Sequence, residues 1–208
     1  MNIRKICTLA PVIPVIVIDA IDHAAPLARA LIDGGLKVLE VTLRTPVALE
    51  AIRRMIEVAP DAIVGVGTLM SPSDMAAAKE AGAVFGVSPG ATPELLDTAR
   101  DMALPMLPGV ATPSEAMAAN ACGYEVLKFF PAEANGGVTV LKAWSSPLAS
   151  ISFCPTGGVS LANAETYLGL SNVLCVGGSW VAPKTLMQQG DWAGITKLAR
   201  EAKSLDAG

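Results

Sequence analysis

The chain has 208 residues, of which 52% are hydrophobic, 4% aromatic and 16% charged, and its formal net charge is −4. So many aliphatic residues exclude a disordered chain. The negative charge and the lack of any basic cluster argue against a nucleic-acid or anionic-membrane surface.

Short aliphatic runs alternate with segments of helical periodicity along the whole chain. The runs predict strands at 12–18, 37–43, 62–68, 83–89, 105–110, 125–130, 151–157 and 173–178. The segments between them predict helices at 22–33, 46–58, 72–81, 93–102, 113–121, 138–144, 161–169 and 191–204. The runs are apolar on both faces, which is typical of parallel strands covered on both sides. Eight βα units without a linker predict an α/β fold with one domain over 1–208, a closed (β/α)8 TIM barrel rather than an open doubly wound sheet.

Three further features limit the class of protein: the longest apolar run near the start, the cysteines and the single histidine. The apolar run 10–18 is shorter than the roughly 20 residues of a membrane span, and we interpret it as a buried strand rather than a signal peptide. Four scattered cysteines favour reduced thiols and a cytoplasmic location. The single histidine, His23, excludes a two- or three-histidine metal site within one chain, and we expect it to be a surface or capping residue. We expect no metal and no cofactor.

Polar residues cluster at the ends of the predicted strands, where barrel enzymes carry their catalytic groups. They are Glu40, Arg44, Thr68, Ser88, Lys128, Glu133, Thr156-Gly157-Gly158 and Gly177-Gly178-Ser179. Because these strand ends meet at one face of a barrel, the sequence predicts a site there.

Lys128 is the most unusual of these residues, because it lies in the apolar run "EVLKFF". Burial disfavours the charged form of an amine, and a neutral amine can form an imine with a ketone. The alternative is a side chain that points outward and extends its stem along the helix layer. We favour the functional interpretation.

The segment "LEVTLRT" places Glu40 inside a buried strand and Arg44 four residues later. A guanidinium binds a carboxylate through two parallel hydrogen bonds, and a carboxylate can act as general acid and base. The alternative is a structural Glu40–Arg44 ion pair at the barrel mouth.

Two glycine-rich turns, "CPTGG" and "VGGSW", follow the last two predicted strands. Barrel enzymes commonly bind phosphate there through backbone N–H groups, although tight turns alone would also require glycine. Together these features predict a 2-keto acid substrate with a phosphate at its far end, cleaved by aldol chemistry without a metal.

The chain resembles the class I 2-keto-3-deoxy-6-phosphogluconate (KDPG) aldolases, the family that also includes 4-hydroxy-2-oxoglutarate aldolases. The resemblance extends nearly end to end and is most specific in "LKFFPAEANGG" and "FCPTGG". It implies a cytoplasmic, homotrimeric lyase of carbohydrate metabolism. That enzyme would cleave KDPG to pyruvate and glyceraldehyde 3-phosphate in the Entner–Doudoroff pathway.

The resemblance also implies a role for each site residue. Lys128 would form the Schiff base and Glu40 would be the general acid and base. The substrate would be bound by Arg44, Thr68, Pro89, Phe130, Thr156, Gly157, Gly158, Gly178 and Ser179. Val66 departs from the family pattern, which has a small alanine there, and we expect it to crowd the third strand near Thr68.

Several alternatives stay open at this stage. Related aldolases act on 4-hydroxy-2-oxoglutarate or on the C4-epimeric phosphogalactonate substrate. A phosphosugar isomerase or epimerase would use Glu40 and Lys128 as acid and base without an imine. A barrel that only binds a phosphorylated metabolite would not need either residue.

Overall fold

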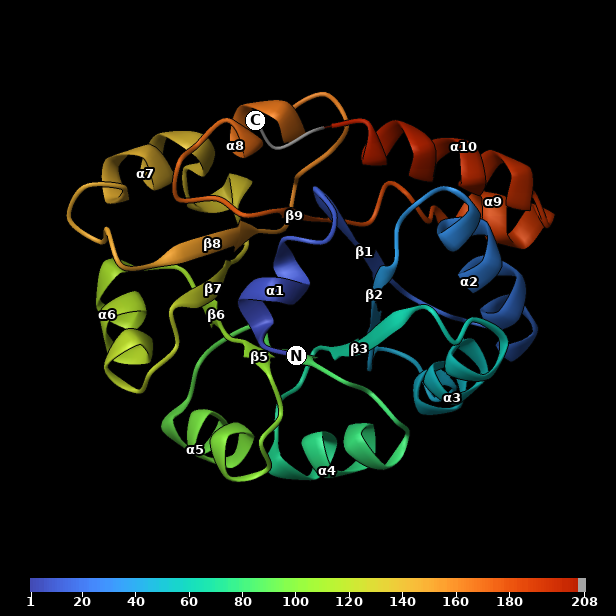
Figure 1. Ribbon diagram of the computed structural model, residues 1–208, viewed down its shortest axis with the longest axis horizontal. Helices are drawn as coiled ribbons and strands as arrows, with labels where there is room; N and C mark the ends of the chain where they lie inside the picture. The colour runs from blue at the N-terminus through green and yellow to red at the C-terminus, as the bar shows by residue number, and fades with distance from the viewer. Residues whose placement is uncertain (206–208) are drawn as a thin grey trace.

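A computed structural model describes residues 1–205 of the protein, in which parallel strands form an inner ring and helices an outer one (Figure 1). The strands are β1 (Val12–Ile16), β2 (Val38–Thr42), β3 (Ile63–Gly67), β4 (Gly86–Val87), β5 (Met106–Leu107), β6 (Gly109–Val110), β7 (Val126–Phe129), β8 (Ser152–Pro155) and β9 (Val176–Gly178). The helices are α1 (Ile3–Cys7), η1 (Ile21–His23), α2 (Ala24–Asp33), α3 (Ala48–Val58), α4 (Pro72–Glu80), α5 (Pro93–Asp101), α6 (Pro113–Ala121), η2 (Glu133–Asn135), α7 (Gly137–Trp144), α8 (Ala164–Leu168), α9 (Lys184–Gln189) and α10 (Trp192–Lys203).

The strand order closes the ring. One sheet runs β5-β4-β3-β2-β1-β9 and a second runs β6-β7-β8. Bridges between Phe153 and Val173 and between Thr156 and Gly177 connect β8 to the segment of β9, while β5 and β6 follow each other in the chain on either side of Pro108. The predicted (β/α)8 barrel is therefore confirmed.

The fifth predicted strand, 105–110, forms two short strands rather than one. Proline has no backbone N–H to donate to a neighbouring strand, and Pro108 lies at the break. As a result β5 pairs with β4 on one side, whereas β6 pairs with β7 on the other.

The predicted helices are all present, with small differences at their ends. The segment 22–33 opens with the 3-10 turn η1 before α2 begins. The predicted helix starts are confirmed where Ser71, Thr92 and Thr112 accept hydrogen bonds from backbone N–H groups of the first turn. The α-helices α1 and α9 and the 3-10 turn η2 were not predicted, because six residues or fewer are too few to show helical periodicity.

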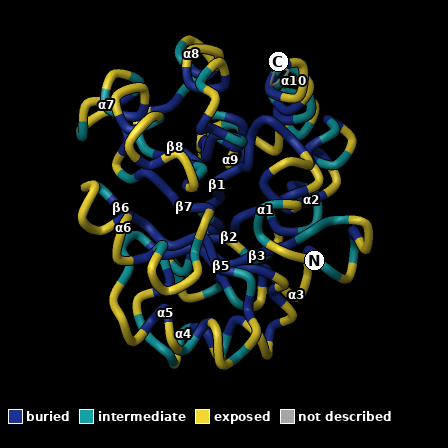
Figure 2. The backbone as a smooth tube through the Cα atoms, turned by 60° about the vertical axis from the view of Figure 1, so that its left-hand side comes forward, coloured by how far each residue is buried: buried dark blue, intermediate teal, exposed yellow. Residues whose placement is uncertain are grey.

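Two hydrophobic cores stabilise the barrel. The larger one lies between the strands and the outer helices and includes Val66, so that this side chain packs away from the site and the expected crowding near Thr68 is wrong. The smaller core fills the barrel interior and joins Ile6 and Cys7 of α1 in one cluster with Phe85 and Val126. Figure 2 shows the buried backbone concentrated in the strands and the exposed positions along the helices.

Helix α1 covers the end of the barrel at which the strands begin, so the opposite end is the one left for the polar strand ends (Figure 1). Within residues 1–205, every helix is too short or too polar to span a bilayer.

Candidate active site

Two adjoining cavities lie where the strands end. The inner one, about 180 Å3, is lined by Val15, Glu40, Thr42, Arg44, Thr68, Pro89, Lys128, Phe130 and Thr156. The outer one, about 490 Å3, is lined by Val15, Val17, Arg44, Phe130, Thr156, Gly157, Gly158, Val159, Gly177, Ser179, Trp180, Ala182, Pro183 and Lys184. Since the two share four lining residues, they form one continuous site with a narrow floor and a wider mouth.

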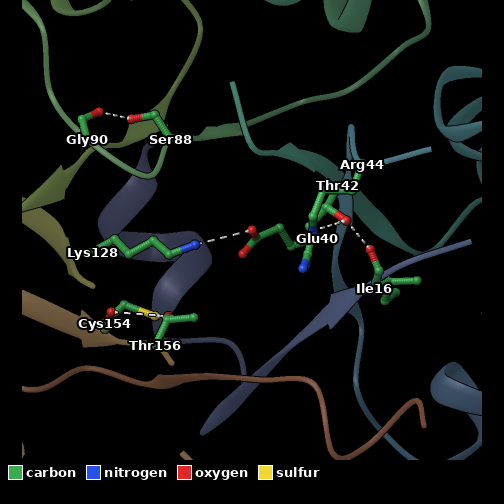
Figure 3. Close-up of polar contacts among 9 residues, drawn as sticks. All are labelled: Ile16, Glu40, Thr42, Arg44, Ser88, Gly90, Lys128, Cys154 and Thr156. Carbon is green, nitrogen blue, oxygen red and sulfur yellow. Dashed lines mark hydrogen bonds and ion pairs between the residues drawn. The ribbon is translucent and has the colours of Figure 1, made fainter. Parts of the chain in front are cut away.

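Lys128 and Glu40 meet across the floor of the site. Lys128 comes from β7 and Glu40 from β2, and their side chains point toward one another (Figure 3). The Lys128 Nζ lies 3.5 Å from Glu40 Oε1 and 5.0 Å from the centroid of the Phe130 ring. Only 6% of Lys128 and 3% of Glu40 are exposed, so the alternative in which Lys128 points outward is wrong.

The contact between these two side chains is an ion pair rather than a short hydrogen bond. Hydrogen bonds from nitrogen to oxygen are typically about 2.7–3.2 Å long, and Glu40 Oε1 accepts none from the described residues. Two buried ionisable groups are expensive to desolvate. Glu40 Oε1 is buried near the amine but accepts no hydrogen bond from the described residues. A carboxylate oxygen in this state is suited to take a proton from a bound molecule.

Arg44 is oriented by a neighbour that sequence analysis missed. The Thr42 hydroxyl donates a 2.7 Å hydrogen bond to the carbonyl of Ile16 and accepts one of 3.0 Å from Arg44 Nε (Figure 3). Thr42 is buried and lies between Glu40 and Arg44 at alternating positions, which share one face of a strand. This two-residue spacing is visible in the sequence and could have identified Thr42 as a site residue. Among the described residues, Glu40 forms its ion pair with Lys128 and not with Arg44. The alternative of a structural Glu40–Arg44 ion pair is therefore wrong.

Thr68 lines the inner cavity and has an unusual backbone conformation. Its φ is 65°, in the left-handed region that β-branched residues rarely adopt. Such strain persists only where surrounding structure enforces it, and it clusters at functional sites. Ser88, by contrast, lines neither cavity, and its hydroxyl donates a 2.6 Å hydrogen bond to the carbonyl of Gly90 within the same loop (Figure 3).

The turn after β8 forms one wall of the outer cavity. Gly157 and Gly158 have φ of 99° and 78°, which glycine alone adopts readily. The turn is fixed to the loop after β7, because Glu133 N donates to the Gly157 carbonyl at 3.1 Å. A side chain at Gly158 would lie 2.5 Å from the Cγ of Glu133. The glycines therefore meet the needs of a tight turn and also expose backbone to the cavity.

Glu133 is in turn bound to α8. The Tyr167 hydroxyl donates a short hydrogen bond to Glu133 Oε1. Burial, followed by this hydrogen bond, raises the pKa of Tyr167 above its ordinary value. This hydrogen bond connects α8 to η2.

The turn after β9 is placed differently from the prediction. Gly177 lines the outer cavity, whereas Gly178 does not. A side chain at Gly178 would lie 1.8 Å from the six-membered ring of Trp180, so this glycine makes room for the indole. Ser179 lines the outer cavity as expected. Apart from Ser88 and Glu133, which line neither cavity, every other predicted site residue lines one of the two.

The remaining candidate groups lie elsewhere. His23 is partly exposed at the start of α2 and packs against the edge of Trp192, with ring centroids 5.7 Å apart. Within residues 1–205, no group of three His, Cys, Asp or Glu side chains is arranged to hold a metal ion. A further cavity, about 620 Å3, lies at the other end of the barrel between α1 and the loops that precede β5 and β7. It contains neither Lys128 nor Glu40.

Comparison with known proteins finds a family model and relatives that match nearly the whole chain. A family model described as "KDPG and KHG aldolase" matches residues 3–198. The chain is 51% identical to the KHG/KDPG aldolase of Escherichia coli strain K12 over 199 residues, which cover 96% of this chain and 93% of that protein.

Solved structures match over nearly the whole length. The KDPG aldolase of Legionella pneumophila, with pyruvate captured as a covalent carbinolamine intermediate, has a TM-score of 0.96 at 45% identity and covers 98% of both chains. The aldolase of Zymomonas mobilis ZM4 with 3-phosphoglycerate has a TM-score of 0.92 at 47% identity and covers 97% of this chain and 95% of its own.

Proposed function

The chain belongs to the KDPG and KHG aldolase family, and we propose that it cleaves 2-keto-3-deoxy-6-phosphogluconate to pyruvate and glyceraldehyde 3-phosphate through an imine on Lys128. The observation that carries this proposal is the Lys128–Glu40 pair, buried at the floor of a small cavity with 3.5 Å between its charged atoms. A buried amine beside a carboxylate without a hydrogen-bond donor is what imine formation and proton transfer require.

The first half of the proposed reaction joins substrate to enzyme. Lys128 Nζ, in its neutral form, attacks the C2 ketone to form a carbinolamine. Loss of water gives an iminium ion, whose positive nitrogen can accept the electron pair of a bond broken between C3 and C4. This electron sink is supplied by the lysine itself, so the step requires no metal or cofactor.

The second half breaks the carbon–carbon bond. Glu40 takes the proton of the C4 hydroxyl, C4 becomes an aldehyde, and the C3–C4 electron pair moves into an enamine. Glyceraldehyde 3-phosphate leaves, Glu40 returns a proton to C3, and water hydrolyses the resulting iminium to release pyruvate and free Lys128. One carboxylate can serve all these transfers because Glu40 Oε1 accepts no other hydrogen bond from the described residues.

The rest of the site supports this orientation of the substrate. Arg44 and Thr68 lie on the floor with the reacting pair, and we assign them to the substrate carboxylate. Pro89, Phe130 and Thr156 shape the pocket beside the iminium. The glycine turn 157–158 and Ser179 line the outer cavity, and we assign them to the phosphate. Holding both ends aligns the C3–C4 bond with the iminium.

Borohydride trapping tests the proposal. With pyruvate, reduction should attach a three-carbon adduct to the peptide that carries Lys128, and mass spectrometry should locate it. Lys128→Ala should lose the adduct and the cleavage activity but keep its thermal melting curve, whereas the exposed Lys142→Ala should retain both. No adduct at all would favour the isomerase or epimerase alternative, and an adduct on another lysine would refute the assignment of Lys128.

Two properties of the whole protein complete the proposal. We assign a homotrimer, as the family resemblance implies. We also assign a cytoplasmic location, which fits the four cysteines, since all are free and three of them, Cys7, Cys154 and Cys175, are buried in the barrel interior.

A further inference from the structure

Lys184 is a cation at the mouth of the site that the sequence did not single out. It lines the outer cavity together with the glycine turn 157–158 and Ser179. Its Nζ lies 2.8 Å from Oδ2 of Asp19, which comes from the loop after β1. Lysine and aspartate lie far apart in the sequence, so only the closed ring of strands brings them together.

Both charged side chains that line the outer cavity are cations. Its charged lining residues are Arg44 and Lys184, and no carboxylate belongs to its lining. Arg44 is also part of the inner cavity and is bound to Thr42, which directs it toward the floor. Lys184 is therefore the cation available at the mouth, on the same side as the glycine turn.

We propose that Lys184 is a further binding residue for the phosphate end of the substrate, and that Asp19 holds its ammonium at the rim of the cavity until the phosphate arrives. This inference rests on the proposed function and extends it. It assigns part of the preference for a phosphorylated keto acid to a side chain, in addition to the backbone N–H groups and hydroxyl already described.

The Asp19–Lys184 pair is suited to exchange one anion for another. The two side chains are 47% and 54% exposed, and exposed ion pairs contribute little to stability. A phosphate carries more charge than a carboxylate and offers three acceptor oxygens. The flexible stem of lysine allows its ammonium to move from the carboxylate toward the cavity at little cost.

A matched pair of substrates isolates the effect. Values of kcat/KM should be measured for 2-keto-3-deoxy-6-phosphogluconate and for the same keto acid without phosphate. In Lys184→Met we expect the ratio of the first value to the second to fall about 3- to 10-fold at low salt, as for the loss of one partly exposed charged contact. The decrease should become smaller as added salt screens the charge. Lys142→Met removes the same charge from the exposed face of α7 and should leave the ratio unchanged.

Asp19→Asn separates phosphate binding from a structural ion pair. If Lys184 binds phosphate, loss of the competing carboxylate should keep the ratio at the wild-type value or raise it. If the pair only braces the rim, Asp19→Asn and Lys184→Met should lower the ratio alike.

The proposal is overturned by a wild-type ratio in Lys184→Met, or by an equal decrease in Asp19→Asn. In both cases the pyruvate imine on Lys128 would still form, so the aldolase assignment would stand. Loss of the imine in the wild-type protein would instead refute the proposed function itself.

Discussion

At the scale of single residues, the site depends on where one proton can go. Lys128 and Glu40 are buried together, and the carboxylate oxygen nearest the amine accepts no hydrogen bond from residues 1–205. A carboxylate that served only structure would be expected to be saturated with donors, because buried polar groups usually are. Glu40 is instead held ready for a donor that arrives with the substrate.

Glu40→Gln tests this role without changing the shape of the side chain. The variant should still form the imine with pyruvate, because Lys128 is intact. It should exchange the methyl protons of pyruvate and cleave substrate roughly 10²- to 10⁴-fold more slowly, which is typical for loss of a positioned acid or base. NMR of proton–deuterium exchange together with a thermal melt measures both effects. Near-normal exchange in a destabilised variant would return Glu40 to a structural role and leave the proton transfer to another group of the site.

At the scale of the elements, the register between strands creates the space for Glu40. Strands β2 and β3 pair so that Glu40 lies opposite Gly65 and Thr42 opposite Gly67. A side chain at Gly67 would lie 2.2 Å from Glu40 Oε1. The glycine on β3 thus determines where the carboxylate on β2 can lie.

Gly67→Ala should displace the carboxylate while the barrel stays folded, because the atom it meets is the far end of a flexible side chain. A shift of about 1 Å in a reacting group can lower the rate by roughly 10²-fold. Measured kcat should therefore fall in Gly67→Ala with little change in the melting temperature. Gly169→Ala is the control, because its new side chain would make an ordinary 3.5 Å contact with the Glu165 carbonyl. Unchanged kcat in a folded Gly67→Ala protein would contradict this account.

The contact between α8 and η2 predicts a dependence of stability on alkaline pH. Because burial and the bond to Glu133 raise the pKa of Tyr167 in the folded protein, the folded state keeps the phenol proton longer than the unfolded state does. Tyr167 therefore makes its full contribution to the free energy of unfolding below the unfolded pKa of about 10. That contribution decreases as the pH rises from there through the higher pKa of the folded state.

Tyr167→Phe should lower the free energy of unfolding by roughly 1.5–3 kcal/mol at pH 8, the usual loss for a hydrogen bond to a charged group. The difference from the wild-type protein should then narrow above about pH 10, where the tyrosine begins to lose its advantage. Urea unfolding at pH 8 and at pH 10.5 measures both points. An equal difference at the two pH values would show that Tyr167 does not titrate in this way.

At the scale of the whole molecule, the candidate site and the helix that closes the barrel lie at opposite ends of the barrel. The strand ends carry Lys128, Glu40 and both cavities, whereas α1 covers the other end and packs into the interior core (Figure 1). Such a division is characteristic of barrel enzymes, because the loops after the strands can vary without disturbing the core.

The proposed trimer is a prediction at this scale. Sedimentation equilibrium should give a mass of about 64 kDa, three times the 21.3 kDa of one chain, since three copies related by a threefold axis close into a ring. The mass should not change over a tenfold dilution from micromolar concentrations. A mass of 21.3 kDa would show that the chain acts as a monomer.

The sequence by itself determined the alternation of strands and helices and placed the reactive residues at the strand ends. Local periodicity and covalent order carry that information: the two-residue repeat of a strand puts Glu40, Thr42 and Arg44 on one face whatever the fold. The helix starts at 72, 93 and 113 were predictable for the same reason, since the capping residues Ser71, Thr92 and Thr112 each bond within the first turn of their own helix.

Only the tertiary structure decided which side chains meet across the ring. That Glu40 pairs with Lys128 rather than Arg44, that Gly177 and not Gly178 lines the cavity, and that Asp19 reaches Lys184 all depend on how the strands are staggered around the barrel. The stagger of the strands follows from packing between residues that are distant in the chain, so it cannot be predicted from any local sequence pattern. The orphaned oxygen of Glu40 is visible only once its neighbours on β3 and β7 are in place, because a hydrogen-bond partner is a property of the folded surroundings.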